Sequence, residues 1–249
     1  MGLAIEVVIF DFIGTLATVE GYAYENSVKR MYESLRDVGF NMDYEHFIQA
    51  YERAHQKYRA IRYQELIEVT NVVWLSEALN SLGFATNPDE ENVKEAINIF
   101  FKDYIRSLRR RNCAVRTLKT LLKGRYALGL ISNFTYAPVI YAGLRKLNLS
   151  QYFNAILVSE DVGWRKPHPR IFKEALKRLD KKADQTVFVG DSPVEDIKGA
   201  KDVGMRTIFV PSQFFTVEDA QKAPQQPDII LNELCKLPEI LSSKAFLEV

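Results

Sequence analysis

Residues 7–16 read VVIFDFIGTL, an apolar run that ends in a carboxylate at Asp11. Consecutive Val, Ile and Phe residues favour a strand that is buried on both faces, as in a parallel sheet. In open parallel sheets the ligand crevice lies beyond the carboxyl ends of the strands, so Asp11 would stand at its rim. Because a charge beside an apolar strand costs free energy unless it is paired, Asp11 either caps the following turn or is kept anionic for chemistry. This stretch alone leaves both interpretations open.

The composition is ordinary for a globular protein. Of the 249 residues, 47% are apolar and 26% charged, and 33 Lys and Arg nearly balance 32 Asp and Glu. The net charge of +1 gives no general attraction for nucleic acids or acidic membranes. We find neither a secretory leader pattern nor an apolar run long enough to span a bilayer. We therefore expect a cytoplasmic protein whose partner is a small molecule, with no nucleic-acid or membrane partner.

The chain has two cysteines, Cys113 and Cys235. Two cysteines are too few for a disulfide framework. We expect both to be small buried apolar side chains in a reducing cytosol.

The chain divides into a helical part and an alternating part. Between about residues 23 and 109, apolar residues recur at helical spacing and no strand pattern occurs. From residue 116 onward strand-like and helical segments alternate, which indicates a parallel, doubly wound sheet. The predicted fold class is α/β: a Rossmann-like core of residues 1–18 and 110–249, with a smaller all-helical domain of residues 19–109.

The helical domain is inserted between Asp11 and the rest of the sheet. Because both of its connections must then lie near Asp11, the insert suits a lid or specificity cap over the carboxyl ends of the strands. The alternative is a helical insert that only enlarges the core. At its end, the arginine-rich segment 106–111 is predicted to be a solvated hinge face, with a substrate phosphate contact as the alternative.

Polar residues follow two further predicted strands. Ser132 and Asn133 end the strand that begins at about residue 126, and their hydroxyl and amide groups could donate to an anion. Lys166 follows the next strand, between bulky neighbours and prolines that would hold it in place. A lysine held in this way can neutralise a carboxylate or bind a phosphate oxygen.

Acidic residues follow a fourth predicted strand, which ends at Asp191 and is succeeded by Asp196. With Asp11 these residues would form the hard-oxygen site that Mg²⁺ prefers. Three carboxylates alone would repel a phosphate dianion. Mg²⁺ and Lys166 together would balance their charge, so that a phosphoryl group could enter.

Four short motifs resemble the haloacid dehalogenase superfamily in their order and in their positions at strand ends. The motifs are Asp11-Phe-Ile-Gly-Thr15, Ser132-Asn133, Lys166-Pro167 and Gly190-Asp191-Ser-Pro-Val-Glu-Asp196. The resemblance covers essentially the whole chain, and the helical insert resembles the cap that this superfamily places between its first two motifs. It implies a hydrolase that acts on a small phosphorylated or halogenated molecule.

The resemblance also implies roles for individual residues. Asp11 would be the covalent nucleophile, and Ser132, with Asn133 beside it, would hold the transferring group. Lys166 would orient Asp11, balance its charge and contact the substrate.

The metal site implied by the resemblance is a Mg²⁺ site. Its ligands would be the carboxylates of Asp11 and Asp191, with support from Asp196. The backbone carbonyl of Ile13, two residues after the nucleophile, would be a further ligand.

Ile13 is also where the sequence departs from the phosphatases of this superfamily, which carry a second Asp at this position to protonate the leaving alcohol. Isoleucine cannot transfer protons, and losing a positioned acid/base costs about 10²–10⁴-fold in rate. The backbone carbonyl remains, so metal binding need not be lost. A proton donor from the insert could compensate, with Glu20, Tyr22, His46 and His55 as candidates.

Three functions fit these observations. The first is a Mg²⁺-dependent phosphohydrolase with altered acid/base chemistry, acting through an Asp11 phospho-aspartyl intermediate. The second is a metal-independent enzyme like the 2-haloacid dehalogenases, which also have a non-acidic residue at the Ile13 position. The acidic motif that ends at Asp196 argues against the second. The third is a catalytically impaired module that binds phosphate or metal, against which the retention of all the other motif residues argues.

Overall fold

The computed structural model describes residues 5–243 and confirms the predicted α/β class. A six-stranded parallel sheet has the strand order β5-β4-β1-β6-β7-β8. Its strands are β1 (Val7–Phe10), β4 (Ala127–Ser132), β5 (Ala155–Val158), β6 (Thr186–Gly190), β7 (Arg206–Phe209) and β8 (Ile229–Ile230). Strand β1, which ends just before Asp11, is therefore central, with paired neighbours on both sides.

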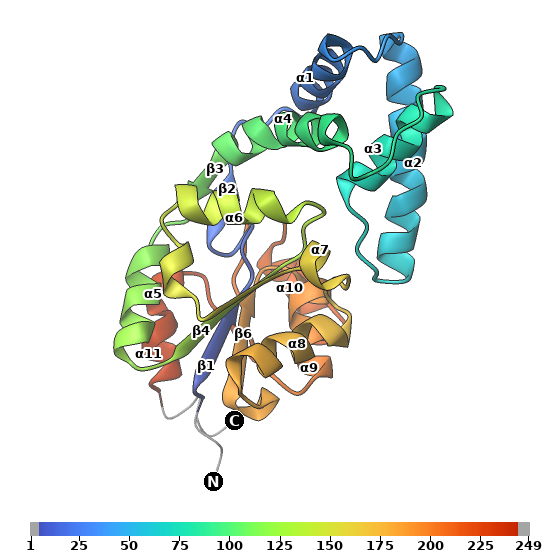
Figure 1. Ribbon diagram of the computed structural model, residues 1–249. Helices are drawn as coiled ribbons and strands as arrows, with labels where there is room; N and C mark the ends of the chain where they lie inside the picture. Colours follow the sequence, from blue (N-terminus) through green and yellow to red (C-terminus); the bar gives the residue numbers. More distant parts are fainter. Residues whose placement is uncertain (1–4, 244–249) are drawn as a thin grey trace.

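Helices cover both faces of this sheet (Figure 1). They are α5 (Ala114–Lys123), α6 (Ala137–Lys146), α7 (Ser159–Val162), α8 (Pro169–Leu179), α9 (Gly199–Asp202), α10 (Val217–Lys222) and α11 (Leu237–Leu241). Short helical turns are η1 (Ser150–Tyr152), η2 (Ala183–Gln185), η3 (Pro193–Lys198) and η4 (Leu234–Lys236). Side chains of β1 alternate between the two apolar layers: Val8 and Phe10 pack in the layer of α5, α6 and α11, and Val7 and Ile9 in that of α8 and α9. This double burial explains the uninterrupted apolar run.

The predicted helical insert is confirmed as four helices with an apolar core of their own. They are α1 (Tyr24–Asp37), α2 (Tyr44–Gln64), α3 (Asn71–Ser81) and α4 (Glu91–Ser107). Figure 1 shows these helices beyond the carboxyl ends of the strands, where a cap is expected. Asp43 caps α2 by accepting hydrogen bonds from the backbone N–H groups of Glu45 and His46. Val139 of α6 joins the apolar core of the insert, so the cap packs against the sheet domain.

Two short strands that we did not predict connect the cap to the sheet domain. Strands β2 (Ala17–Val19) and β3 (Leu108–Arg110) form an antiparallel pair. Both chain crossings therefore lie side by side, across the predicted limits at residues 18 and 110. Those limits themselves stay a prediction. Each strand has only three residues, which is too short for a periodic pattern to reveal. In β3, two of the three are exposed arginines.

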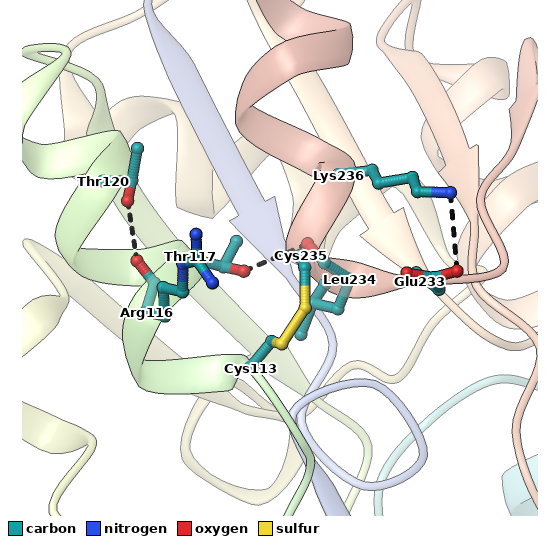
Figure 2. Close-up of a disulfide and its surroundings, with 8 residues drawn as sticks. All are labelled: Cys113, Arg116, Thr117, Thr120, Glu233, Leu234, Cys235 and Lys236. Carbon is teal, nitrogen blue, oxygen red and sulfur yellow. Dashed lines mark hydrogen bonds and ion pairs between the residues drawn. A yellow bond between two sulfur atoms is a disulfide. The ribbon is translucent and has the colours of Figure 1, made fainter.

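The expectation of two unpaired thiols is wrong. Cys113 and Cys235 form a disulfide with Cα atoms 5.4 Å apart (Figure 2). The chain returns onto the start of α5, where the hydroxyl of Thr117 donates to the carbonyl of Leu234 at 3.0 Å. The disulfide joins residues 122 positions apart, so sequence spacing could not reveal it. The cysteines consequently give no support to the predicted reducing compartment.

None of the helices within residues 5–243 combines the length and the apolar character needed to cross a bilayer.

Candidate active site

The sheet register brings the predicted strand ends together. Phe10, the last residue of β1, lies opposite Leu130 of β4 and Val189 of β6. The backbone N–H of Asp11 continues the β1–β6 ladder by donating to the Val189 carbonyl at 2.9 Å. Asp11 therefore leaves the sheet between the ends of β4 and β6, as the edge rule for parallel sheets predicts.

Lys166 lies at the centre of the candidate site. Its buried Nζ donates to Asp11 Oδ1 at 2.8 Å, Asp196 Oδ1 at 2.6 Å and the Ile131 carbonyl at 3.0 Å. Burial alone would lower the pKa of this ammonium, but the two carboxylates outweigh it and raise the pKa above its ordinary value. Lys166 is consequently a fixed positive charge, as the sequence predicted from its confined position.

Asp11, Asp191 and Asp196 form a buried carboxylate cluster in which one oxygen from each lies within 4.8 Å of the others. Burial, and then the neighbouring carboxylates, raise the pKa of Asp191 to about 8. Burial also raises the pKa of Asp11 and that of Asp196, the latter to about 7, although Lys166 opposes both shifts. When ionised, the cluster carries two negative charges more than Lys166 can neutralise.

The oxygens of the carboxylate cluster differ in their availability. Asp11 Oδ2 is buried and has no hydrogen-bond partner within residues 5–243. Asp191 Oδ2 accepts from the hydroxyl of Ser212 at 2.5 Å, which leaves Oδ1. Asp196 uses both oxygens, because Oδ1 accepts from Lys166 and Oδ2 from the N–H groups of Asp191 and Ser192 at 3.0 and 2.9 Å.

A divalent cation fits this arrangement. A buried carboxylate oxygen without a partner is costly, and Mg²⁺ takes oxygen ligands and offsets negative charge. Asp11 and Asp191 have oxygens to offer, and the Ile13 carbonyl makes no hydrogen bond to the described residues. Asp196 is less available as a direct ligand, because both of its oxygens already accept hydrogen bonds. In this geometry it orients Lys166 and the loop after β6.

Two glycines allow the carboxylates to approach the backbone. Gly14 has a φ of +105°, and a Cβ atom there would lie 2.1 Å from Asp191 Oδ2. At Gly190 a Cβ atom would lie 2.4 Å from Asp196 Oδ2. Larger residues at either position would push a carboxylate out of the cluster.

Arg111 and Ser212 belong to the site's framework and were not predicted. The Arg111 guanidinium donates to the carbonyls of Gly14 and Pro211, both at 2.6 Å, and joins two loops of the site. The prediction of a solvated hinge face therefore fits the exposed Arg109 and Arg110 but not Arg111, which is partly buried. The sequence signal was only the arginine run, which does not distinguish one member from another.

Ser132 and Asn133 both lie at the end of β4, as predicted. Ser132 is buried. The Asn133 amide donates to the Lys166 carbonyl at 2.9 Å and accepts from its N–H at 2.7 Å. Asn133 therefore fixes the backbone of Lys166 and uses its side chain for that purpose.

A pocket of about 400 Å³ lies between the cap and the sheet domain. Asn133, Arg165 and Glu195 line it from the sheet side, and mainly aromatic residues line it from the cap. Tyr104 is one of these, and its ring lies 5.4 Å from that of Phe134. This position is suited to the part of a substrate that surrounds the reacting group.

Two of the four candidate proton donors line this pocket, and two do not. Tyr22 and His55 are among the lining residues. The side chains of Glu20 and His46 are 63% and 74% exposed, and they lie beside Arg109 and Asp43 respectively.

A second group of buried charges joins the cap to the sheet domain, and we call Arg62, Glu68, Arg165 and Glu195 the cap–core charge cluster. Glu68 is fully buried; it accepts from Arg62 Nε and from the Ser159 hydroxyl, each at 2.5 Å. Arg165 lies 3.6 Å from Glu68 and donates to Glu195 at 3.1 Å. No motif in the sequence indicated this cluster.

Comparisons with known proteins agree with this geometry. Residues 8–210 match the family described as haloacid dehalogenase-like hydrolase. Glyceraldehyde 3-phosphate phosphatase of Pyrococcus furiosus is 34% identical over 129 residues, which cover 51% of this chain and 52% of that protein. The chain thus aligns with about half the length of this relative. Ribulose-1,5-bisphosphate 5-phosphatase of Halopiger xanaduensis is 26% identical over 214 residues, with coverage of 84% and 88%.

A solved structure shares both the core and the cap. The crystal structure of 2-haloacid dehalogenase from Pseudomonas syringae pv. Tomato DC3000 aligns with a TM-score of 0.66 and 26% identity. The alignment covers 96% of this chain and 98% of that one. With four helices inserted after the first strand, carboxylates at the strand ends and a family match over most of its length, the chain belongs to the haloacid dehalogenase-like hydrolases.

Proposed function

We propose that the protein is a Mg²⁺-dependent phosphatase that acts on a small phosphorylated sugar or a similar molecule. The observation that carries this proposal is the unbalanced carboxylate cluster with its unpartnered oxygen on Asp11. The similar glyceraldehyde 3-phosphate and ribulose-1,5-bisphosphate phosphatases support the substrate class. The proposed site consists of Asp11, Ser132 and Lys166 for catalysis, Asn133 as their neighbour on the substrate side, and a cation site.

The cation would be held by Asp11, Asp191 and the Ile13 carbonyl, with Asp196 in support. Bound Mg²⁺ would offset the excess negative charge and draw a phosphate oxygen toward the nucleophile. Lys166 favours the ionised form of Asp11 and orients it through its 2.8 Å hydrogen bond. Ser132, at the end of the neighbouring strand, would donate to the phosphoryl group.

In the first proposed step an Asp11 carboxylate oxygen forms a bond to phosphorus, and the ester P–O bond breaks. The bonding pair leaves on the alcohol oxygen, which must then gain a proton. In the second step a water oxygen bonds to phosphorus and the P–O bond to Asp11 breaks, which restores the carboxylate and releases inorganic phosphate that carries the protons of the water. Nucleophilic catalysis of this kind divides one difficult displacement into two.

Ile13 makes the leaving group important. Because isoleucine supplies no proton, esters whose alcohols leave readily as anions should react well and simple alkyl esters poorly. This proposal therefore includes a stronger dependence on leaving-group acidity than a phosphatase with a carboxylic acid at this position would have.

The test is release of p-nitrophenol from p-nitrophenyl phosphate with Mg²⁺ and then with EDTA. We expect turnover that requires the metal and is lost in Asp11→Asn. Turnover that persists in EDTA, or in Asp11→Asn, would contradict the proposal. As a matched control, Asp43→Asn removes only the charge of an exposed helix-capping residue and should retain activity.

Dehalogenation is the second candidate, because Ile13 is non-acidic and the similar 2-haloacid dehalogenase aligns over nearly the whole chain. In this reaction Asp11 would displace halide from carbon without a metal. Halide release from 2-chloropropionate in EDTA, combined with no release from phosphate esters, would favour this candidate over the phosphatase.

A further inference from the structure

Arg62 of the cap presents unused hydrogen-bond donors to the pocket. Only 10% of its side chain is exposed, and it lines the 400 Å³ pocket between cap and sheet domain. Nε donates to Glu68 at 2.5 Å, and this is the only hydrogen bond of the guanidinium within residues 5–243. The ring of Trp74 lies 5.8 Å from its central carbon. Glu68 and Trp74 thus fix the guanidinium and leave Nη1 and Nη2 without partners.

The two Nη atoms face the pocket, where a ligand oxyanion could take the place of the water that would otherwise hydrate them. Glu68 accepts from Arg62 Nε with one oxygen and from Ser159 with the other, and no hydrogen bond joins it to either Nη atom. The same end of the pocket is electrically positive: burial, and then Arg62 and Arg59, lower the pKa of His55. Glu195, the negative residue of the pocket wall, lies on the sheet side, where Arg165 pairs with it.

The pocket adjoins the proposed catalytic centre. Each of three lining residues is the direct sequence neighbour of a proposed site residue: Asn133 follows Ser132, Arg165 precedes Lys166 and Glu195 precedes Asp196. Tyr104 also lines the pocket, and its pKa is raised by burial and then by the nearby Tyr22 and Asp11. A molecule with its phosphoryl group at the carboxylate cluster would therefore extend toward this pocket. A volume of about 400 Å³ is near the lower end for ligand sites, which favours a substrate of a few carbon atoms.

We propose that Arg62 is a specificity residue whose Nη1 and Nη2 bind a second oxyanion, a carboxylate or another phosphoryl group, at the end of the substrate remote from the reacting phosphate. The two Nη atoms of a guanidinium form a planar fork that matches two oxygens of such a group. Aromatic residues of the cap would contact the carbon chain between the two anionic ends. This inference rests on the proposed phosphatase function and specifies the substrate class of the same site.

The test measures binding, so that it does not depend on turnover. Calorimetry with Mg²⁺ and the Asp11→Asn protein would compare ω-phosphooxy carboxylates of one to four methylene groups with the corresponding ω-hydroxyalkyl phosphates. We expect at least one carboxylate to bind about tenfold more tightly than its neutral counterpart, the difference of one good charged contact. A parallel series of alkanediol bisphosphates distinguishes a carboxylate from a second phosphoryl group.

Arg62→Lys in the same background keeps the charge toward Glu68 but removes the fork, and should reduce the preference for the oxyanion to less than about threefold. Arg53→Lys is the matched control, because Arg53 is exposed on the same helix, and should leave the preference unchanged. If Arg62→Lys does not fold, Arg62→Met with Glu68→Gln removes both buried charges together and should also abolish the preference.

The outcomes separate the inference from the proposed function. Equal binding of oxyanion and neutral members, or a preference that survives both Arg62 variants, would overturn the inference alone. If no phosphate ester binds at all, the proposed function and the inference both fail.

Discussion

The carboxylate cluster and the cap–core charge cluster both bury charged side chains, but they are completed in different ways. In the cap–core charge cluster two arginines face two glutamates, and the charges sum to zero. In the carboxylate cluster three acids face one lysine, and an oxygen of Asp11 has no partner within residues 5–243. The charges of the first cluster balance one another, and its buried atoms without a hydrogen-bond partner in the described part of the chain are donors, Arg165 Nε and Nη1. The second keeps an excess of negative charge when its acids are ionised, so the imbalance of charge, more than its burial, identifies the candidate reactive centre.

The largest expected effect tests that imbalance. Asp191→Asn removes a charge and a candidate ligand, and we expect kcat/KM for p-nitrophenyl phosphate to fall by about 10³-fold. Mg²⁺ titrations of activity should also show weaker apparent binding. Asp202→Asn, which removes an acid in an exposed pair with Lys198, should change neither. A loss below tenfold in Asp191→Asn would mean that the carboxylate cluster is not the cation site.

The cap–core charge cluster should respond in stability instead of catalysis. Glu68→Gln leaves Arg62 without its charged partner, and we expect the free energy of unfolding to fall by about 3 kcal/mol in urea titrations. Glu77→Gln breaks an exposed pair with Lys57 and should cost less than about 1 kcal/mol. If the two variants were equally stable, the cap–core charge cluster would not stabilise the domain contact.

Ile13→Asp should add the missing proton donor beside the carboxylate cluster. A carboxylic acid at this position could protonate the leaving alcohol, and we expect kcat for simple alkyl phosphates to rise by about 10²-fold. The rate for p-nitrophenyl phosphate, whose leaving group needs no proton, should change little. Ile13→Asn is the control of similar polarity that cannot donate in this way. No increase in Ile13→Asp would show that another group, with Tyr22 and His55 as candidates in the pocket, already supplies the proton.

The last prediction is a pH dependence of stability. The raised pKa values of Asp191 and Asp196, about 8 and 7, mean that the folded chain binds protons there more readily than the unfolded chain, whose ordinary value is 3.8. Protonation of this pair should therefore stabilise the folded chain as pH falls, so that Tm in EDTA rises between about pH 9 and pH 5. Mg²⁺ should flatten that rise in Tm, and Asp191→Asn should reduce it. An identical Tm profile with and without Mg²⁺ would contradict the assignment.

Much of the fold could be predicted because it depends on local patterns. Uninterrupted apolar runs indicated the buried parallel strands, and polar residues directly after them indicated the strand ends. Since parallel strands share one carboxyl edge, Asp11, Lys166 and Asp191 could be placed together without knowing the strand order. The helical spacing of the insert was equally local.

The remaining features depend on contacts between distant segments. Arg111 differs from its neighbouring arginines only in what it contacts, and Glu68 has no sequence feature that distinguishes it from other acids. Ser212 is far from the motif residue that it supports. Strands β2 and β3 are stabilised by each other and not by a pattern of their own.

The disulfide closes a covalent ring, with one arm of the chain before it and a shorter one, carrying α11, after it. Cys113 and Cys235 close the ring, which contains β4 to β8 and thus Ser132, Lys166 and Asp191. The arm before Cys113 carries β1, Asp11 and the entire cap. The proposed nucleophile is therefore not part of the ring that supplies its partners, and hydrogen bonds of β1 to β4 and β6 hold it between them. In topological terms, the candidate active site is complete only while β1, which lies outside the ring, is paired with β4 and β6 inside it.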